Sequence, residues 1–233
     1  TVVISSCKTT PMPFRTRPFL IAAIAMLLTG PAALVSGQET ASNSAQSGRK
    51  STLGMRFVSV PGTTVLFSVY ETRVGEWNQF LRARKYPWTF EPHFKQDENH
   101  PVVGVNLQDA IAFCNWLTEK EREENLLNNA QSYRLPTDAE WSIASGLNED
   151  RPPGTTPASL SGKNDNHFPW GGDFPPRSED RPGNLADAAF HQKFPDVPWL
   201  EGFKDDFVTT APVMSFKPNA LGLHDMGGNS AEW

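Results

Sequence analysis

Apolar and polar residues alternate along GMRFVSVPGTTVLF (54–67), on both sides of a Pro-Gly pair. Alternation with a period of two around a turn dipeptide predicts two short β-strands joined as a hairpin. Further along the chain, Phe80 and Leu81 follow Trp77 by three and four positions, as residues on one face of a helix do. This spacing predicts a helix over residues 73–84.

The run HPVVGV (100–105) predicts a short buried strand, and the strongest helical pattern of the chain follows it. Asn106 is suited to cap the start of this helix, and the carboxylate of Asp109 favours the positive first turn. The expected helix covers residues 107–122. Its apolar face is formed by Leu107, Ala110, Phe113, Cys114 and Leu117.

A third helix is predicted to begin after Thr137, because Glu140 stands three residues later and completes a capping box. Trp141 and Ala144 of this helix should face inward. Beyond Gly146 the regular patterns fade, and Pro, Gly, Asp and Asn dominate. Long irregular loops in a compact domain usually carry function. The expected fold class is therefore a loop-rich α+β domain.

The N-terminal part has the pattern of a secretory signal peptide. Arg15 and Arg17 precede an apolar stretch over residues 19–28, and a Gly-Pro break and small residues follow. The prediction is a signal peptide over residues 1–37 and an extracytoplasmic, secreted or periplasmic protein. A membrane anchor is the alternative, but a span needs about 18 or more unbroken apolar residues. No stable membrane span is expected after cleavage.

The first residue is Thr, and Met12 stands just before the basic residues, so translation is expected to start at Met12. Cleavage is expected near Gly37. Residues 38–53 are polar and can bury little, which predicts a flexible linker. The folded domain is then expected over residues 54–233.

Composition narrows the function classes. The net charge is −5, so no basic surface is available for nucleic acid, which is excluded as an expected partner. No nucleophile elbow, phosphate-binding glycine loop or HExxH helix is present. The five histidines show no metal-ligand spacing, so zinc is not expected.

The sequence has two cysteines, and Cys7 precedes the apolar stretch of the leader. Cys114 is then alone in the mature chain. Its place on the apolar helix face favours a small buried side chain. The alternative is a disulfide with a partner beyond residue 233.

Two late segments carry the oxygen ligands that Ca²⁺ prefers, next to glycines that let backbone carbonyls turn inward. A capped turn with solvated carboxylates is the alternative in each case. The first segment pair is GNLADA (183–188) with KDDF (204–207), and the second segment is HDMGGNSAEW (224–233). Their oxygen-bearing side chains belong to Asn184, Asp205 and Asp206, and to Asp225, Asn229 and Glu232.

Several motifs resemble, in order and spacing, the formylglycine-generating enzyme family, also called sulfatase-modifying factor domains. They cover most of residues 54–233 and would not co-occur by accident. The motifs are HPVVGVNLQDAIAFCNWL (100–117), YRLPTDAEWSIA (133–144), FPWGG (168–172), GN (183–184) and TAPVMSFKPNALGLHDMGGNSAEW (210–233). The resemblance implies a loop-rich fold related to C-type lectin domains, with bound calcium.

The same resemblance implies two calcium sites. One ion would be held by the side chains of Asn184 and Asp205 with the carbonyls of Leu185 and Phe207. The other would be held by the side chains of Asp225 and Glu232 with the carbonyls of Gly228 and Ser230.

Enzymes of this family oxidise a cysteine in a Cys-x-Pro-x-Arg stretch of an unfolded sulfatase to formylglycine. They use O₂ and a copper ion held by two cysteines that follow the last motif. The resemblance therefore implies a domain that is incomplete at its C-terminus, with copper only if a following region carries the cysteine pair. No catalytic residue is expected within residues 54–233, and Ala231 replaces a common Trp.

Two functions stay open. One is a formylglycine-generating oxidase lacking its catalytic cysteines in this chain, with an unfolded sulfatase as partner. The other is a non-catalytic, calcium-stabilised, lectin-like domain that binds a glycan or a protein. An iron-dependent sulfoxide synthase would need an upstream helical domain with metal-binding histidines, which residues 1–53 do not supply.

Overall fold

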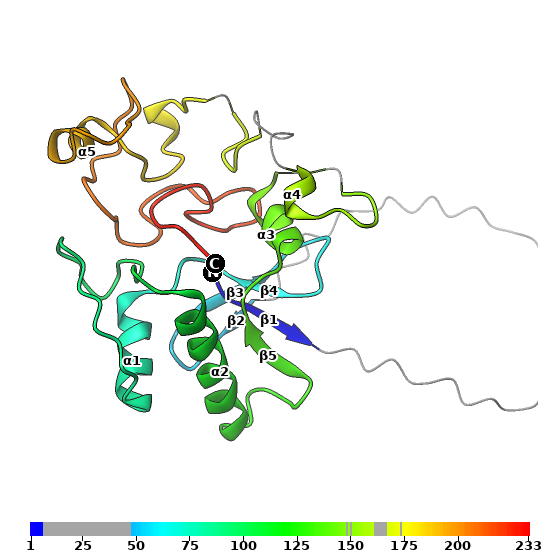
Figure 1. Cartoon of the computed structure of the whole chain (residues 1–233). Helices are drawn as coiled ribbons and strands as arrows, with labels where there is room; N and C mark the ends of the chain where they lie inside the picture. The colour runs from blue at the N-terminus through cyan, green and yellow to red at the C-terminus, as the bar shows by residue number, and fades with distance from the viewer. Residues whose placement is uncertain (7–47, 148, 150, 161–166, 173) are drawn as a thin grey trace, which may run out of the picture. The chain divides into compact units, whose positions relative to one another are not determined.

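The computed structural model describes residues 1–6, 48–147, 149, 151–160, 167–172 and 174–233 (Figure 1). These residues belong to one compact unit, Thr1–Cys7 with Gln46–Trp233. The helices and the 3₁₀ turn are α1 (Val74–Arg84), α2 (Leu107–Glu123), α3 (Asp138–Ser145), α4 (Pro157–Leu160), η1 (Ser178–Asp180) and α5 (Ala188–Lys193). Within the described residues, no helix is both long and apolar enough to cross a membrane.

In the described part of the chain, five antiparallel strands form one sheet in the order β2-β3-β4-β1-β5. The predicted hairpin is confirmed, because β3 and β4 pair across the Pro-Gly turn. The strands are β1 (Val3–Ser6), β2 (Arg49–Lys50), β3 (Arg56–Ser59), β4 (Leu66–Ser68) and β5 (Gln131–Arg134).

Strand β1 lies between β4 and β5 (Figure 1). Val2 and Ile4 join one core cluster and Val3 joins another, so both faces of the strand are buried. The prediction of a signal peptide over residues 1–37 stays a prediction, and the structure adds that residues 3–6 form a strand of the sheet. Three consecutive apolar residues, which the sequence placed upstream of a signal segment, fill two cores.

The predicted linker also ends earlier than expected. Arg49–Lys50 forms the edge strand β2, and Ser51 and Leu53 are buried. Arg49 bonds the buried carboxylate of Glu121 on α2, which ties this segment to the core. The predicted cleavage site and the start at Met12 lie outside the described residues and stay predictions.

Helices α1, α2 and α3 confirm the predicted helices 73–84 and 107–122 and the third helix after Thr137. Asn106 caps α2 as predicted, because its side chain accepts from the Asp109 N–H at 3.0 Å. Asp109 in turn accepts from the Asn106 N–H at 3.1 Å, which completes a reciprocal cap that was not predicted. The predicted apolar face needs one correction, since Leu107 is exposed. It stands in the first turn of the helix, ahead of the part that packs on the sheet.

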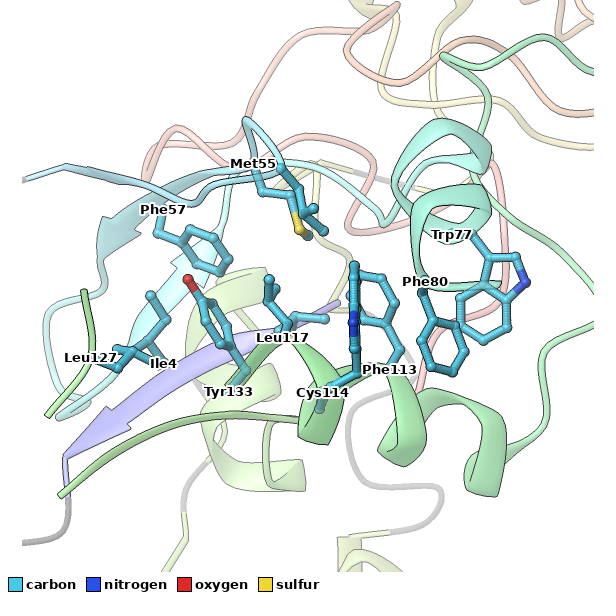
Figure 2. Close-up of a cluster of buried hydrophobic side chains, with 13 residues drawn as sticks. Ile4, Met55, Phe57, Trp77, Phe80, Phe113, Cys114, Leu117, Leu127 and Tyr133 are labelled. Carbon is cyan, nitrogen blue, oxygen red and sulfur yellow. The ribbon is translucent and has the colours of Figure 1, made fainter. Parts of the chain in front are cut away.

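The main core lies between α1, α2 and the sheet (Figure 2). Aromatic rings from the two helices pack together there: Phe113 stacks on Trp77 at 5.7 Å between centroids and meets Phe80 edge-on at 5.8 Å. Tyr133 of β5 contacts Phe57 of β3 at 5.5 Å. Such pairs add about 0.5–1.5 kcal/mol each beyond the burial of their area.

One secondary-structure prediction was wrong, and one strand was not predicted. Residues 100–105 form no strand and contribute one isolated bridge between Pro101 and Arg73. Pro101 lacks an N–H, and Gly104 has φ +74°, so this run turns instead of extending. Strand β5 was missed, because its residues were interpreted as the segment that leads into α3.

The loop-rich α+β class is confirmed, since the described residues after α3 hold only short helical turns.

Candidate metal centre

The first predicted calcium segment comes together around the carboxylate of Asp205. Its two oxygens accept from the N–H of Leu185 at 2.7 Å and from the N–H of Phe207 at 2.8 Å. Asp205 is buried, and burial raises the pKa of its carboxyl, although the two N–H bonds act in the opposite direction. The structure thus places Leu185 and Phe207 beside Asp205 through their N–H groups, with Asn184 next to Leu185 in the chain, and their role as calcium ligands stays a prediction.

A second carboxylate in this region was not anticipated. Asp187 is fully buried, caps α5 by accepting from the Phe190 N–H at 2.9 Å, and accepts from the Asp205 N–H at 3.3 Å. The available signal was an aspartate ahead of a short helix. Asp206, by contrast, pairs with Arg181 and Lys204 at the surface and lies outside the predicted ligand set.

The second predicted segment centres on Asp225, which is 4% exposed. Its Oδ2 accepts from the Met214 N–H at 3.0 Å, whereas its buried Oδ1 has no hydrogen-bond partner. Burial raises the pKa of this carboxyl. An orphaned buried carboxylate oxygen costs free energy, so Asp225 Oδ1 is a candidate ligand oxygen.

Glu232, the second predicted carboxylate, is held from two sides. Its Oε2 accepts from the Trp141 indole N–H at 3.0 Å, and its Oε1 accepts from the Thr1 hydroxyl and lies 3.4 Å from the Thr1 ammonium group. The Gly228 carbonyl accepts from the Ser230 N–H at 2.9 Å, which closes the turn between the two predicted carbonyl ligands.

Sequence reasoning missed Glu71, which lies between β4 and α1. It is 4% exposed, its Oε2 accepts from the Asn229 side-chain N–H at 2.8 Å, and its Oε1 has no partner. Burial, together with the charges of Asp225 and Glu232, raises the pKa of this carboxyl well above its usual range. The sequence carries little signal for it, because a glutamate in a connection is ordinarily solvated.

Asn229 joins the two predicted segments. Its backbone N–H donates to the Asn184 carbonyl at 2.8 Å, and its side-chain oxygen accepts from the Asn184 amide at 3.0 Å. The backbones approach so closely that a Cβ on Gly228 would stand 2.6 Å from the Asn184 carbonyl oxygen. The two candidate calcium loops are therefore one packed unit.

A cavity of about 450 Å³ borders the second segment. Glu71 and Glu232 line it together with apolar residues that include Trp77, Val105 and Trp233. The Trp233 indole donates to the Val105 carbonyl at 2.8 Å. The polar end of this mainly apolar cavity thus belongs to the carboxylate cluster.

The donor chemistry restricts which metal could fit. Among the described residues, no group of three or more His, Cys, Asp and Glu side chains could hold a metal ion by itself. An ion at either segment must therefore take backbone carbonyl or amide oxygens as well. Ca²⁺ accepts such mixed oxygen sets, so the residues fit calcium.

Copper(I) requires soft thiolate ligands, and Cys114 does not offer one. It is buried on α2, and burial raises the pKa of its thiol to about 12. The expectation of a small buried side chain is confirmed. Cys7 lies outside the described residues.

A family model described as "Sulfatase-modifying factor enzyme 1-like domain" matches residues 37–233. The chain is 32% identical over 137 residues to the formylglycine-generating enzyme of Thermomonospora curvata, covering 58% of the chain and 33% of that protein. It is 30% identical over 135 residues to the mouse (Mus musculus) formylglycine-generating enzyme, covering 58% and 27%. The matched part therefore spans about a third or less of these relatives.

A protein named inactive C-alpha-formylglycine-generating enzyme 2, from Bos taurus, is 31% identical over 134 residues, covering 57% of the chain and 32% of that protein. A solved structure, PvdO from Pseudomonas aeruginosa, aligns with a TM-score of 0.44 at 21% identity, covering 76% of this chain and 55% of that one. Since the family model matches well over half of the residues, the chain belongs to the sulfatase-modifying factor enzyme 1-like domain family.

Proposed function

We propose that this chain is the calcium-stabilised scaffold of a formylglycine-generating-enzyme-like domain. The observation that carries the proposal is a pair of buried carboxylate oxygens without partners, Glu71 Oε1 and Asp225 Oδ1, in one cluster with Glu232. Among the ion pairs of the described residues, none joins Glu71 or Asp225 to a Lys or Arg.

An unpaired buried carboxylate destabilises a fold by about 1–3 kcal/mol or more. A divalent cation would remove this cost for two carboxylates at once. We place one ion at the side chains of Asp225 and Glu232 with the carbonyls of Gly228 and Ser230, and the charge of this ion would also offset that of the nearby Glu71 carboxylate. The second ion takes the side chains of Asn184 and Asp205 with the carbonyls of Leu185 and Phe207.

The role of the domain is proposed from its relatives. A protein named formylglycine-generating enzyme and a protein named inactive each match more than half of this chain at a similar identity, so membership alone does not decide activity. Because the Cys114 thiol is buried and stays protonated, we propose that residues 48–233 bind a polypeptide such as an unfolded sulfatase without oxidising it. We also propose export through the predicted leader.

Calcium is tested on the purified chain by elemental analysis and by thermal unfolding with and without a chelator. At a calcium concentration of 100 Kd, binding stabilises the folded state by about 2.7 kcal/mol, which is several degrees in Tm for a chain of this size. We expect Asp225→Asn to abolish part of this response. Asp196→Asn, at an exposed position, should leave it unchanged. Absence of both bound calcium and any chelator effect would refute the proposal.

Catalysis is tested separately, by O₂ consumption with a Cys-x-Pro-x-Arg peptide in the presence of copper. We expect the peptide to bind and no copper-dependent O₂ uptake to occur. Uptake that survives Cys114→Ser would show that another group supplies the chemistry, and uptake lost in this variant would contradict the inert role given to Cys114.

A further inference from the structure

Asn184 and Asn229 connect the two candidate calcium sites. Asn184 is a predicted ligand of the first ion, and Asn229 stands between Gly228 and Ser230, whose carbonyls are predicted ligands of the second. The Asn229 N–H donates to the Asn184 carbonyl at 2.8 Å, and the Asn184 side-chain amide donates to the Asn229 side-chain oxygen at 3.0 Å. A ligand residue of one ion is thus bonded directly to the turn that carries the ligands of the other.

Hydrogen bonds fix the orientation of the Asn184 side chain. Its Nδ2 donates to the Thr209 carbonyl and to Asn229 Oδ1. A carbonyl oxygen can only accept, so the amide nitrogen of Asn184 must face Thr209. The amide oxygen then points away from Thr209, and no described residue donates to it. This oxygen can therefore bind the first ion while the nitrogen of the same amide holds Asn229.

A single chain segment, residues 205–214, also contacts both sites. It begins with the aspartate that is predicted to bind the first ion, and at its end the Met214 N–H donates to Asp225 Oδ2 at 3.0 Å. Ala211, between them, is fully buried. Its N–H donates to Asn229 Oδ1 at 2.7 Å, and its carbonyl accepts from the Asn229 amide at 3.2 Å. The Asn229 side chain is therefore fixed on the segment that carries ligands of the first ion.

The two loops pack too tightly to move independently. A Cβ on Gly228 would stand 2.6 Å from the Asn184 carbonyl oxygen and 3.1 Å from Leu185 Cδ2. Fixing a loop backbone costs conformational entropy, so an ion that has ordered one loop spares the next ion part of this cost. Repulsion between the two cations acts in the opposite direction, but buried carboxylates at both sites offset it.

We propose, on the basis of the calcium sites of the proposed function, that the two ions bind with positive cooperativity and that Asn229 is the positioning residue that couples them. Each ion raises the affinity of the other by the same factor, because coupling between two binding equilibria is reciprocal. We expect this coupling factor to be about five or more.

Calorimetric calcium titration of the purified chain and of two single-site variants measures the coupling factor. Asp205→Asn removes the charged ligand of the first ion, and Asp225→Asn removes a charged ligand of the second. We expect the native chain to bind two ions and each variant to bind one. The overall association constant of the native chain should exceed the product of the two single-site constants by about fivefold or more.

Asn229→Gly tests the coupling residue. Glycine tolerates the φ of +68° at this position and keeps the backbone N–H bond to Asn184, but it removes every side-chain bond. The coupling factor should then fall toward one. A purely structural role would lower the single-site constants without changing this factor. Asn125→Gly, at an exposed position with φ +59° after the end of α2, is the matched control and should leave the factor unchanged.

Hydrogen exchange gives a second readout. In Asp225→Asn, calcium binding at the first site alone should slow exchange of the Asn229 amide, because this amide donates to Asn184. The coupling is overturned if the overall constant equals the product of the single-site constants, if Asn229→Gly keeps the native factor, or if the Asn229 amide does not respond to calcium. A native chain that binds no calcium at all would refute the proposed sites themselves, and the coupling with them.

Discussion

Glu140 offers a test of how the YRLPTDAEW motif works. Its carboxylate accepts two bonds from the Arg134 guanidinium, each at 2.7 Å, and one from the Thr137 N–H at 2.8 Å. The Arg134 bonds are the largest cause that lowers the pKa of Glu140 from 4.5 to about 2, and the Thr137 bond adds to them. These contacts join the end of β5 to the start of α3.

The contribution of Glu140 to the free energy of unfolding can be calculated from its pKa shift, because proton binding and folding are linked. A fall from 4.5 to about 2, at about 1.4 kcal/mol for each pKa unit, corresponds to about 3 kcal/mol. The side chain of Glu140 is 17% exposed and that of Arg134 is 35% exposed, so solvent screening reduces the expected contribution to about 2 kcal/mol. Glu140→Gln should therefore lower the free energy of unfolding by about 2 kcal/mol at pH 7.

The sign of the pH dependence is fixed by the direction of the shift. A carboxyl whose pKa is lowered in the folded state contributes stability above its unfolded value of 4.5, and loses it as the pH falls toward about 2. The difference between the native chain and the variant should thus be constant from pH 7 to about 5, then shrink and nearly vanish near pH 2.

The assay is urea unfolding followed by tryptophan fluorescence at a series of pH values. Glu119→Gln is the matched control, since Glu119 pairs with Arg84 at the surface, where both side chains are about half exposed. It should change stability by less than about 1 kcal/mol at every pH. A Glu140→Gln effect that does not shrink between pH 5 and pH 2 would refute the linkage argument.

Three further outcomes are expected. Gly228→Ala should destabilise the chain by about 1–3 kcal/mol, because its Cβ would meet the Asn184 carbonyl, and should also weaken calcium binding, as seen by calorimetry. Phe113→Ala should cost about 3–5 kcal/mol in urea unfolding, because the ring fills the centre of the aromatic cluster. Cys114 should resist a thiol reagent at pH 8 and react once the chain is unfolded in urea, whereas fast labelling of the native chain would contradict its burial.

Local signals predicted much of the fold. The cap of α3 was visible in sequence because Thr137 and Glu140, the partners of its capping box, stand three residues apart. For α2, the sequence indicated Asn106 as the cap, and the structure adds the reciprocal bond of Asp109. The β3–β4 hairpin could also be predicted, because its two strands and the Pro-Gly turn between them are adjacent in the sequence. Strand β1 could not be placed from sequence, because its partners Leu66 and Tyr133 are more than sixty residues away.

The residues of the candidate site also fall into two groups, those that the sequence predicted and those that it missed. The sequence and the family resemblance located Asp205 and Asp225, which stand in loops rich in glycine and oxygen-bearing residues. They missed Glu71, whose proximity to those loops depends on chain segments that meet only in the folded unit. They also missed Asp187, which stands within the named segment GNLADA (183–188) but was not among the predicted ligands. A carboxylate becomes a candidate ligand when the fold buries it. The sequence does not show this burial, because a polar residue in a connecting loop belongs to no periodic hydrophobic pattern.

Asn229 explains why the last motif has an asparagine between the glycine pair and the glutamate. Its left-handed backbone, with φ +68°, suits asparagine better than most side chains. Its amide then donates to Glu71 and to the Ala211 carbonyl, while its side-chain oxygen accepts from Ala211 and Asn184. With every polar atom of the amide used, Asn229 fixes the orientation of the Glu71 carboxylate, and it does so from the same turn that presents Asp225 and Glu232. The motif therefore specifies the geometry of the carboxylate cluster as well as its charges.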